Sequence, residues 1–113
     1  WVGFEGTGMA ATIDLGQATG VVRVGLATLN DHDNWVYHSP HAEVFGSLDG
    51  VEFAKLGEAV DEATTDRVVH LTVPLAGVTT RYLRVVAHCQ TIPPGNQGAG
   101  SPAWLFVDEI VVE

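Results

Sequence analysis

Apolar and polar residues alternate with a period of two along almost the whole chain. Such alternation is typical of β-strands that bury one face, whereas helical periodicity is almost absent. The segments that show the pattern are 11–16, 21–29, 42–50, 51–58, 66–75, 81–88 and 103–112. Short strands separated by turn signals, without a βαβ rhythm, predict an all-β fold with an antiparallel β-sandwich or barrel.

Three local features refine this prediction. Gly16 is expected to end the first strand, and in the second strand Val22 and Val24 are expected to share one buried face. The pair Asp49-Gly50 predicts a hairpin, because glycine accepts the positive φ that tight turns require. Segment 103–112 is almost continuously apolar and rich in β-branched residues. It therefore predicts a central strand that is buried on both faces.

Length and composition indicate one globular domain that covers residues 1–113. A run of about 18 apolar residues, as a membrane span needs, is not found in the sequence. The opening Trp-Val-Gly-Phe is typical of neither a signal peptide nor a transit peptide. We therefore expect the chain to be a piece of a larger protein. A single cysteine, Cys89, is expected to be a half-buried apolar residue.

The charge narrows the classes of partner. The net charge is −9, from 14 acidic residues against 5 lysines and arginines. Such a chain repels nucleic acids and acidic membranes at long range, so we expect neither as a partner. Membrane-binding surfaces also need basic residues beside exposed apolar ones, and basic residues are scarce here.

Catalytic motifs are missing from the sequence, and an autonomous active site is not expected. Neither a nucleophile elbow, nor a phosphate-binding glycine loop, nor a His-Glu-x-x-His motif occurs. Asp108 and Glu109 are adjacent on a predicted strand, so they are expected to point to opposite faces rather than flank one glycosidic bond. His38 and His41 are candidate ligands of a transition metal, although solvated loop histidines are the more economical interpretation.

Segment 30–41, one of two long segments without strand pattern, carries aromatic and polar residues of the kind that bind sugars. Long loops in compact domains are often functional. Aromatic rings cover the apolar faces of a sugar, while a few polar groups bind its hydroxyls. The predicted carbohydrate-binding residues are Asn34, Trp35, Tyr37, His38 and Trp104. The alternative is that the aromatic residues fold back onto the core.

Four stretches in order resemble the discoidin family, also called coagulation factor V/VIII type C domains, which includes many family 32 carbohydrate-binding modules. They are "ATIDLGQATGVVRVGL", "EVFGSLDGVEFAKLG", "TTRYLRVVAH" and "AWLFVDEIVVE". The resemblance implies a discoidin-like jelly roll of the kind appended to bacterial glycoside hydrolases such as β-hexosaminidases. The N-terminal loop of the family pattern is missing here.

The resemblance also implies a structural Ca²⁺ at Glu109, because family members often use a glutamate at this place in the closing strand. The alternative from the residues alone is that Glu109 is a buried carboxylate paired with Arg23, Arg81 or Arg84. As a function, the sequence suggests a non-catalytic carbohydrate-binding module of an exported, extracellular or periplasmic glycoside hydrolase. Its partners would be a glycan and the catalytic domain of the parent protein. The alternative is a structural module that packs against a catalytic domain and binds no sugar.

Overall fold

The computed structural model describes residues 2–60, 66–96 and 98–113, and within these residues the fold is all-β. The strands are β1 (Val2–Glu5), β2 (Met9–Leu29), β3 (His41–Ser47), β4 (Ala54–Val60), β5 (Val68–Ala87) and β6 (Trp104–Val112), and a 3-10 turn, η1, covers His32–Asn34. All pairings between these six strands are antiparallel, and the strands hydrogen-bond in the order β1-β6-β2-β5-β3-β4.

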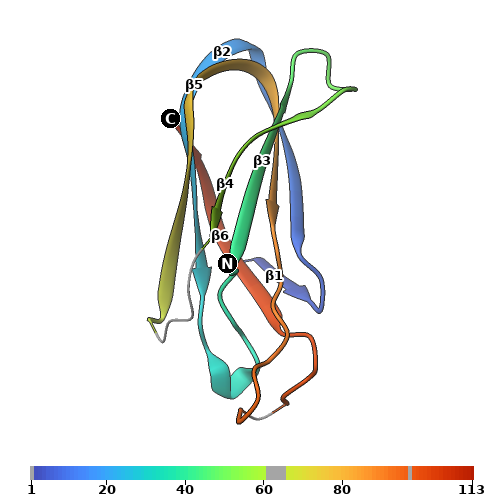
Figure 1. The fold of residues 1–113 in the computed structure, drawn as a ribbon, viewed down its shortest axis with the longest axis vertical. Coiled ribbons are helices and arrows are strands. Elements are labelled where there is room, and N and C mark those ends of the chain that lie inside the picture. Colours follow the sequence, from blue (N-terminus) through green and yellow to red (C-terminus); the bar gives the residue numbers. More distant parts are fainter. Residues whose placement is uncertain (1, 61–65, 97) are drawn as a thin grey trace.

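The two longest strands, β2 and β5, arch over one end of the molecule and contribute to both layers of a sandwich (Figure 1). Residues 9–14 of β2 pair with 82–87 of β5, and that part of β5 continues to β3 and β4. Residues 23–29 of β2 pair with 68–74 of β5 and, on their other side, β2 pairs with β6. The prediction of an antiparallel β-sandwich is therefore confirmed.

The arch explains why two predictions from the strand pattern, those for Gly16 and Val22, are wrong. The pairing of β2 with β5 shifts register between Asp14 and Thr19 and again between Val21 and Arg23. Gly16, with φ of 85°, lies in this bend and does not end a strand. The shift also reverses the faces. Val21 is 1% exposed and Val22 is 50% exposed, so the expected burial of Val22 beside Val24 is wrong.

The core lies between the two layers and is built from the alternate residues that the pattern predicted for β5. The buried cluster contains Met9, Val21, Val24, Leu26, Ala42, Val44, Leu71, Val73, Leu75, Leu83, Val85, Ala87, Leu105 and Val107. Cys89 is half-buried beside this cluster, as expected, and its thiol donates a hydrogen bond to the Ala103 carbonyl at 2.9 Å. Among the described residues, no helix is long and apolar enough to cross a bilayer.

The closing strand β6 is not buried on both faces, which corrects the sequence prediction. Leu105 and Val107 face the core, whereas Asp108, Glu109 and Val111 are exposed. Strand β1 covers β6 only along residues 104–107, so the second half of β6 keeps one edge open. In that half Ile110 and Val112 still pack against the core, whereas Val111 lies on the outer face.

The loops gather at the two ends of the sandwich. Segment 30–40, which contains η1, and segment 88–103 lie together at the end shown at the bottom of Figure 1. The turn 48–53 between β3 and β4 lies at the other end, beside the arch. The predicted hairpin is confirmed, with Gly50 at φ of 77°. The two long segments that the sequence marked as loops are therefore neighbours in space.

Candidate functional site

Segment 30–40 is anchored at its start by a buried asparagine. The Asn30 side-chain amide donates a hydrogen bond to the Asp66 carbonyl at 2.7 Å, and its oxygen accepts one from the His38 backbone N–H at 2.8 Å. The backbone N–H of Asn30 donates to the Arg67 carbonyl at 2.7 Å. These bonds join the segment to the start of β5, so it follows a defined path over the end of the sandwich.

The same segment runs beside the first residue of β6. Tyr37 donates its backbone N–H to the Trp104 carbonyl at 3.1 Å, and the Trp104 N–H donates to the Trp35 carbonyl at 2.8 Å. Val36 forms an isolated parallel bridge with Trp104 and an antiparallel one with Asp31. This pairing confirms the expectation that Trp104 lies beside the loop.

Trp35 turns toward the neighbouring loop rather than standing out from the surface. It has a left-handed backbone, with φ of 64°, at the end of η1. Its half-buried ring packs on a small apolar cluster formed by Tyr37, Ile92 and Ala103. A Cβ added to Gly98 would lie 2.8 Å from the Trp35 ring, so segment 88–103 closes against it.

Two of the predicted sugar-binding residues are buried, and their expected place on the surface is wrong. Tyr37 and His38 are each 3% exposed. Tyr37 stacks on His32 with ring centroids 4.1 Å apart, and burial raises the pKa of its hydroxyl. The Gln90 amide donates to the His38 carbonyl at 2.9 Å, so segment 88–103 covers this residue. Both side chains therefore lie beneath the loop surface and support it.

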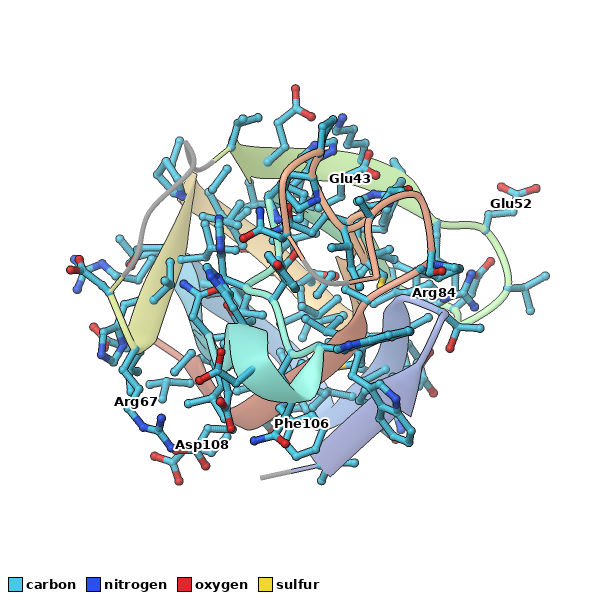
Figure 2. The ribbon with its side chains drawn as sticks, turned by 90° about the horizontal axis from the view of Figure 1, so that it is seen from below. Glu43, Glu52, Arg67, Arg84, Phe106 and Asp108 are labelled. Carbon is cyan, nitrogen blue, oxygen red and sulfur yellow. The ribbon has the colours of Figure 1, made fainter. Side chains whose placement is uncertain are left out.

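Asn34 and Trp104 do meet at the surface, in a hollow of about 330 Å³. Its lining consists of Leu29, Asp31, Asn34, Val36, Trp104 and Phe106. The Phe106 ring lies edge-on to the Trp104 indole, at 6.1 Å and 63°. Seen from below in Figure 2, Phe106 lies next to η1 at this end of the sandwich. An aromatic wall with a carboxamide and a carboxylate at its rim is suited to a small polar ligand with apolar faces.

Phe106 is the residue of this hollow that sequence reasoning missed. In the run Trp104-Leu105-Phe106, the two aromatic residues are two positions apart, so they share one face of β6 while Leu105 enters the core. An added Cβ on Gly3 of β1 would meet the Phe106 ring at 2.8 Å, so the glycine leaves room for it. A period-two aromatic pair at the start of a strand was the available signal.

The alternative of a metal site that uses both His38 and His41 is wrong. His38 is buried, and its Nδ1 lies 3.2 Å from the Asn30 side-chain oxygen. His41 lies on the outer face of β3, where its Nε2 is 2.7 Å from an oxygen of Glu58. His41 is the first residue of β3 and is only half-buried, whereas His38 precedes the strand and is buried. The two imidazoles therefore have different surroundings.

Glu109 is exposed, so the premise that it is a buried carboxylate is wrong. A bulge causes this exposure, because Val107 pairs with Thr28 while Ile110 pairs with Leu26, which leaves one extra residue in β6. The three arginines suggested as its partners interact elsewhere among the described residues. Arg23 pairs with Glu113, Arg81 pairs with Asp14, and Arg84 lies over the Phe53 ring.

The surroundings of Glu109 bear on the calcium prediction, because other carboxylates line the same hollow. Asp108, Glu109 and Glu113 line one hollow of about 240 Å³ on the outer face, together with His70 of β5. The bulge thus brings both members of the Asp108-Glu109 pair to one hollow, contrary to the expectation that they separate. Carboxylate oxygens are ligands that Ca²⁺ prefers, so the donor chemistry fits. Calcium at Glu109 stays a prediction.

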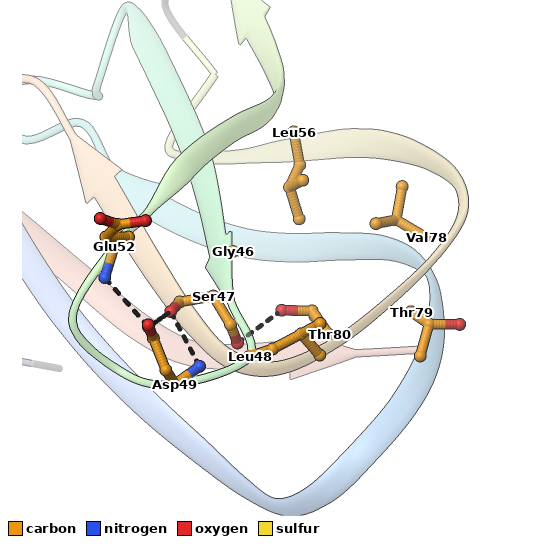
Figure 3. Close-up of a pocket in the computed structure, with 9 residues that line it drawn as sticks. All are labelled: Gly46, Ser47, Leu48, Asp49, Glu52, Leu56, Val78, Thr79 and Thr80. Carbon is orange, nitrogen blue, oxygen red and sulfur yellow. Dashed lines mark hydrogen bonds between the residues drawn. The ribbon is translucent and has the colours of Figure 1, made fainter.

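A further hollow lies at the arch end, and residues of the β3–β4 turn form part of its lining. Gly46, Leu56 and Thr79 are among its lining residues (Figure 3). The Asp49 carboxylate accepts hydrogen bonds from the backbone N–H groups of Val51 and Glu52 and from the Ser47 hydroxyl. These bonds lower the pKa of Asp49 to about 2. Because its polar groups hold the turn together, this hollow is a weaker candidate for a ligand.

The contact between Gly98 and Trp35 yields a testable prediction. Gly98→Ala is expected to lower the free energy of unfolding by more than the cost of about 1–2 kcal/mol for a left-handed alanine, because the new Cβ also collides with the Trp35 ring. Gly100→Ala is the matched control, since Gly100 has φ of +88° with no atom within 4 Å of an added Cβ. Chemical denaturation of both variants measures the difference. Equal losses would show that the loop does not close on Trp35.

Known proteins match this chain in structure, but neither a protein-family model nor a curated protein sequence matches it. The module CBM32-3 from a family 31 glycoside hydrolase of Clostridium perfringens has a TM-score of 0.61 and 18% identity, over 91% of this chain and 64% of that one.

Two other structures match to a similar extent. The C-terminal domain of a chitobiase from Bacteroides fragilis has a TM-score of 0.56 and 19% identity, over 94% of this chain and 62% of that one. The protein CpGH89CBM32-5 from Clostridium perfringens, solved in complex with GalNAc-β-1,3-galactose, has a TM-score of 0.55 and 18% identity, over 91% of this chain and 63% of that one. The chain thus spans less than two thirds of each of these three structures.

The fold is therefore a discoidin-like β-sandwich. More narrowly, it is the sandwich found in family 32 carbohydrate-binding modules, as the sequence resemblance implied.

Proposed function

We infer that this chain is a non-catalytic carbohydrate-binding module and that it binds a neutral glycan in the hollow beside Trp104. The observation that carries the inference is the meeting of Trp104, Phe106 and Asn34 around one surface hollow of about 330 Å³. The indole offers an apolar face to a sugar ring, and the Asn34 amide both donates and accepts hydrogen bonds. Trp104, rather than Trp35, would be the aromatic ring on which the sugar stacks, because Trp35 packs on the neighbouring loop.

The electrostatics favour a neutral glycan. Asp31 lies at the hollow, where its carboxylate accepts a hydrogen bond from the Asn34 amide at 2.8 Å. The whole chain also carries a net charge of −9. An acidic polysaccharide would be repelled by both the local and the long-range field. Galactosides and N-acetylhexosaminides are the first candidates, because one structure of the same fold is a complex with GalNAc-β-1,3-galactose.

The wider setting is part of the same inference. Similar structures belong to a glycoside hydrolase and a chitobiase. A module of an exported bacterial glycoside hydrolase, acting outside the cytoplasm beside a catalytic domain, fits the glycosidases from which those similar structures come. The module would hold its enzyme near the glycan while the catalytic domain performs the hydrolysis.

Titration with sugars tests the inference. We expect weak binding of a neutral galactoside or N-acetylhexosaminide, since a millimolar dissociation constant corresponds to only about −4 kcal/mol. Trp104→Ala should weaken it by about fivefold or more, because a stacked ring contributes about 1 kcal/mol or more at such a site. Calorimetry or NMR titration with galactosides, N-acetylhexosaminides, glucosides and polygalacturonate measures this.

Val111→Ala is the control, because Val111 is an exposed residue at the other end of β6. Its sugar affinity should equal that of the wild type, and melting curves show whether each variant is folded. A wild-type chain that binds none of the sugars would support the structural module instead. Preferential binding of polygalacturonate would contradict the assignment to neutral glycans.

A further inference from the structure

Three strands bring two histidines and two glutamates together on the outer face of the layer that contains β3 and β4. His41 and Glu43 alternate along β3 and so share its outer face. His88 directly follows β5, and its backbone N–H donates to the His41 carbonyl at 2.9 Å. Glu58 of β4 pairs with Glu43 across the hairpin. The strand order, rather than any local motif, makes this group.

The side chains of this group point toward one another. The imidazoles of His41 and His88 stack with centroids 4.7 Å apart and an interplanar angle of 16°. Nε2 of His88 lies 2.6 Å from a Glu43 oxygen. One candidate ligand atom from each of His41, Glu43 and His88 lies within 4.8 Å of the others. All three residues are half-buried, so an ion can reach them while losing part of its hydration shell.

We propose that His41, Glu43 and His88 form a binding site for a divalent transition-metal ion such as Zn²⁺, with Glu58 as a further carboxylate at its edge. Two imidazoles and a carboxylate are the protein ligands that Zn²⁺ takes, with bonds of about 2.0–2.2 Å and a fourth position for water. Binding requires side-chain rotations that bring the three ligand atoms closer than their present separation of up to 4.8 Å. The site lies apart from the proposed glycan hollow and does not depend on it.

A cation already occupies the space between the carboxylates. The Lys55 ammonium lies 3.0 Å from a Glu43 oxygen and 2.8 Å from a Glu58 oxygen. A metal ion bound to Glu43 therefore competes with Lys55. Removing the ammonium should strengthen metal binding, which a purely structural cluster of salt bridges does not predict.

Titration of the chelator-treated chain with Zn²⁺ alone, followed by calorimetry and by the imidazole signals in NMR spectra, tests the proposal. We expect saturable binding that shifts the signals of His41 and His88 and raises the melting temperature. Glu43→Gln, which keeps the side-chain shape, and His88→Ala should each weaken Zn²⁺ binding by about tenfold or more. Lys55→Gln should tighten it.

Glu52→Gln is the matched control for Glu43→Gln, because Glu52 is exposed in the turn 48–53 at the other end of the sandwich. Its Zn²⁺ affinity should equal that of the wild type. Three results would overturn the site: no saturable Zn²⁺ binding by the wild type, equal affinity in the wild type and Glu43→Gln, or unchanged or weaker binding in Lys55→Gln. Melting curves without metal show that each compared variant is folded.

Discussion

Tyr37→Ala is expected to lower the free energy of unfolding by about 3–5 kcal/mol, the cost of truncating a buried aromatic residue. The ring is 3% exposed and packs between His32, Ile92 and Ala103 beneath the 30–40 segment. Its loss leaves a cavity where segments 30–40 and 88–103 meet. Urea or guanidinium denaturation, followed by tryptophan fluorescence, measures the change.

Tyr37→Phe is the matched control, and it separates support of the loop from contact with a sugar. The Tyr37 hydroxyl is buried and has no hydrogen-bond partner among the described residues. Its removal should leave stability unchanged or slightly higher, because an unsatisfied buried hydroxyl is itself unfavourable. Sugar affinity should also be unchanged. A loss of affinity at wild-type stability in Tyr37→Phe would return this residue to the binding surface.

Leu105→Ala is expected to cost about 2–5 kcal/mol, because Leu105 lies in the middle of the main core. It is 0% exposed and enters the core from β6, between the two aromatic residues of the proposed glycan hollow. The same denaturation experiment measures the loss. At temperatures where the variant is still folded, sugar affinity should be close to that of the wild type, since the side chain points away from the hollow.

Val111→Ala again provides the comparison on the same strand. Val111 is 40% exposed on the outer face, so its truncation should cost much less than that of Leu105. Similar losses in both variants would mean that β6 buries both of its faces, as its apolar sequence suggested. That outcome would contradict the layer arrangement described above.

For the predicted sugar site, the sequence indicated the types of residue but not the directions of their side chains. The residue types that suit a sugar could be recognised in segment 30–41, and Trp104 does lie beside that segment. The direction of each side chain could not be recognised. Tyr37 and His38 enter the interior because backbone bonds to Trp104 and Asn30 fix the path of the loop. Trp104 is distant in sequence from Tyr37, and a loop has no periodicity from which to infer a face.

The proposed metal site of His41, Glu43 and His88 shows the same limit of sequence reasoning. The sequence suggested His38 and His41 because they are three residues apart. The histidine that actually stacks on His41 is His88, 47 positions along the chain by their numbers. Only the pairing of β3 with β5 brings them together. A ligand set drawn from neighbouring strands has no fixed spacing in the sequence.

Alternation of apolar and polar residues by itself determined most of the strands and the two-layer class of fold, because burial of one face requires a period of two, and the pair Asp49-Gly50 determined the hairpin. Only the tertiary structure decided that β2 and β5 are continuous and arch into both layers. A bend or bulge changes which residues face inward without changing the residues themselves. For that reason Val22 and Glu109 are exposed, and the surfaces proposed to bind a glycan and a metal ion could be located only from the strand pairing.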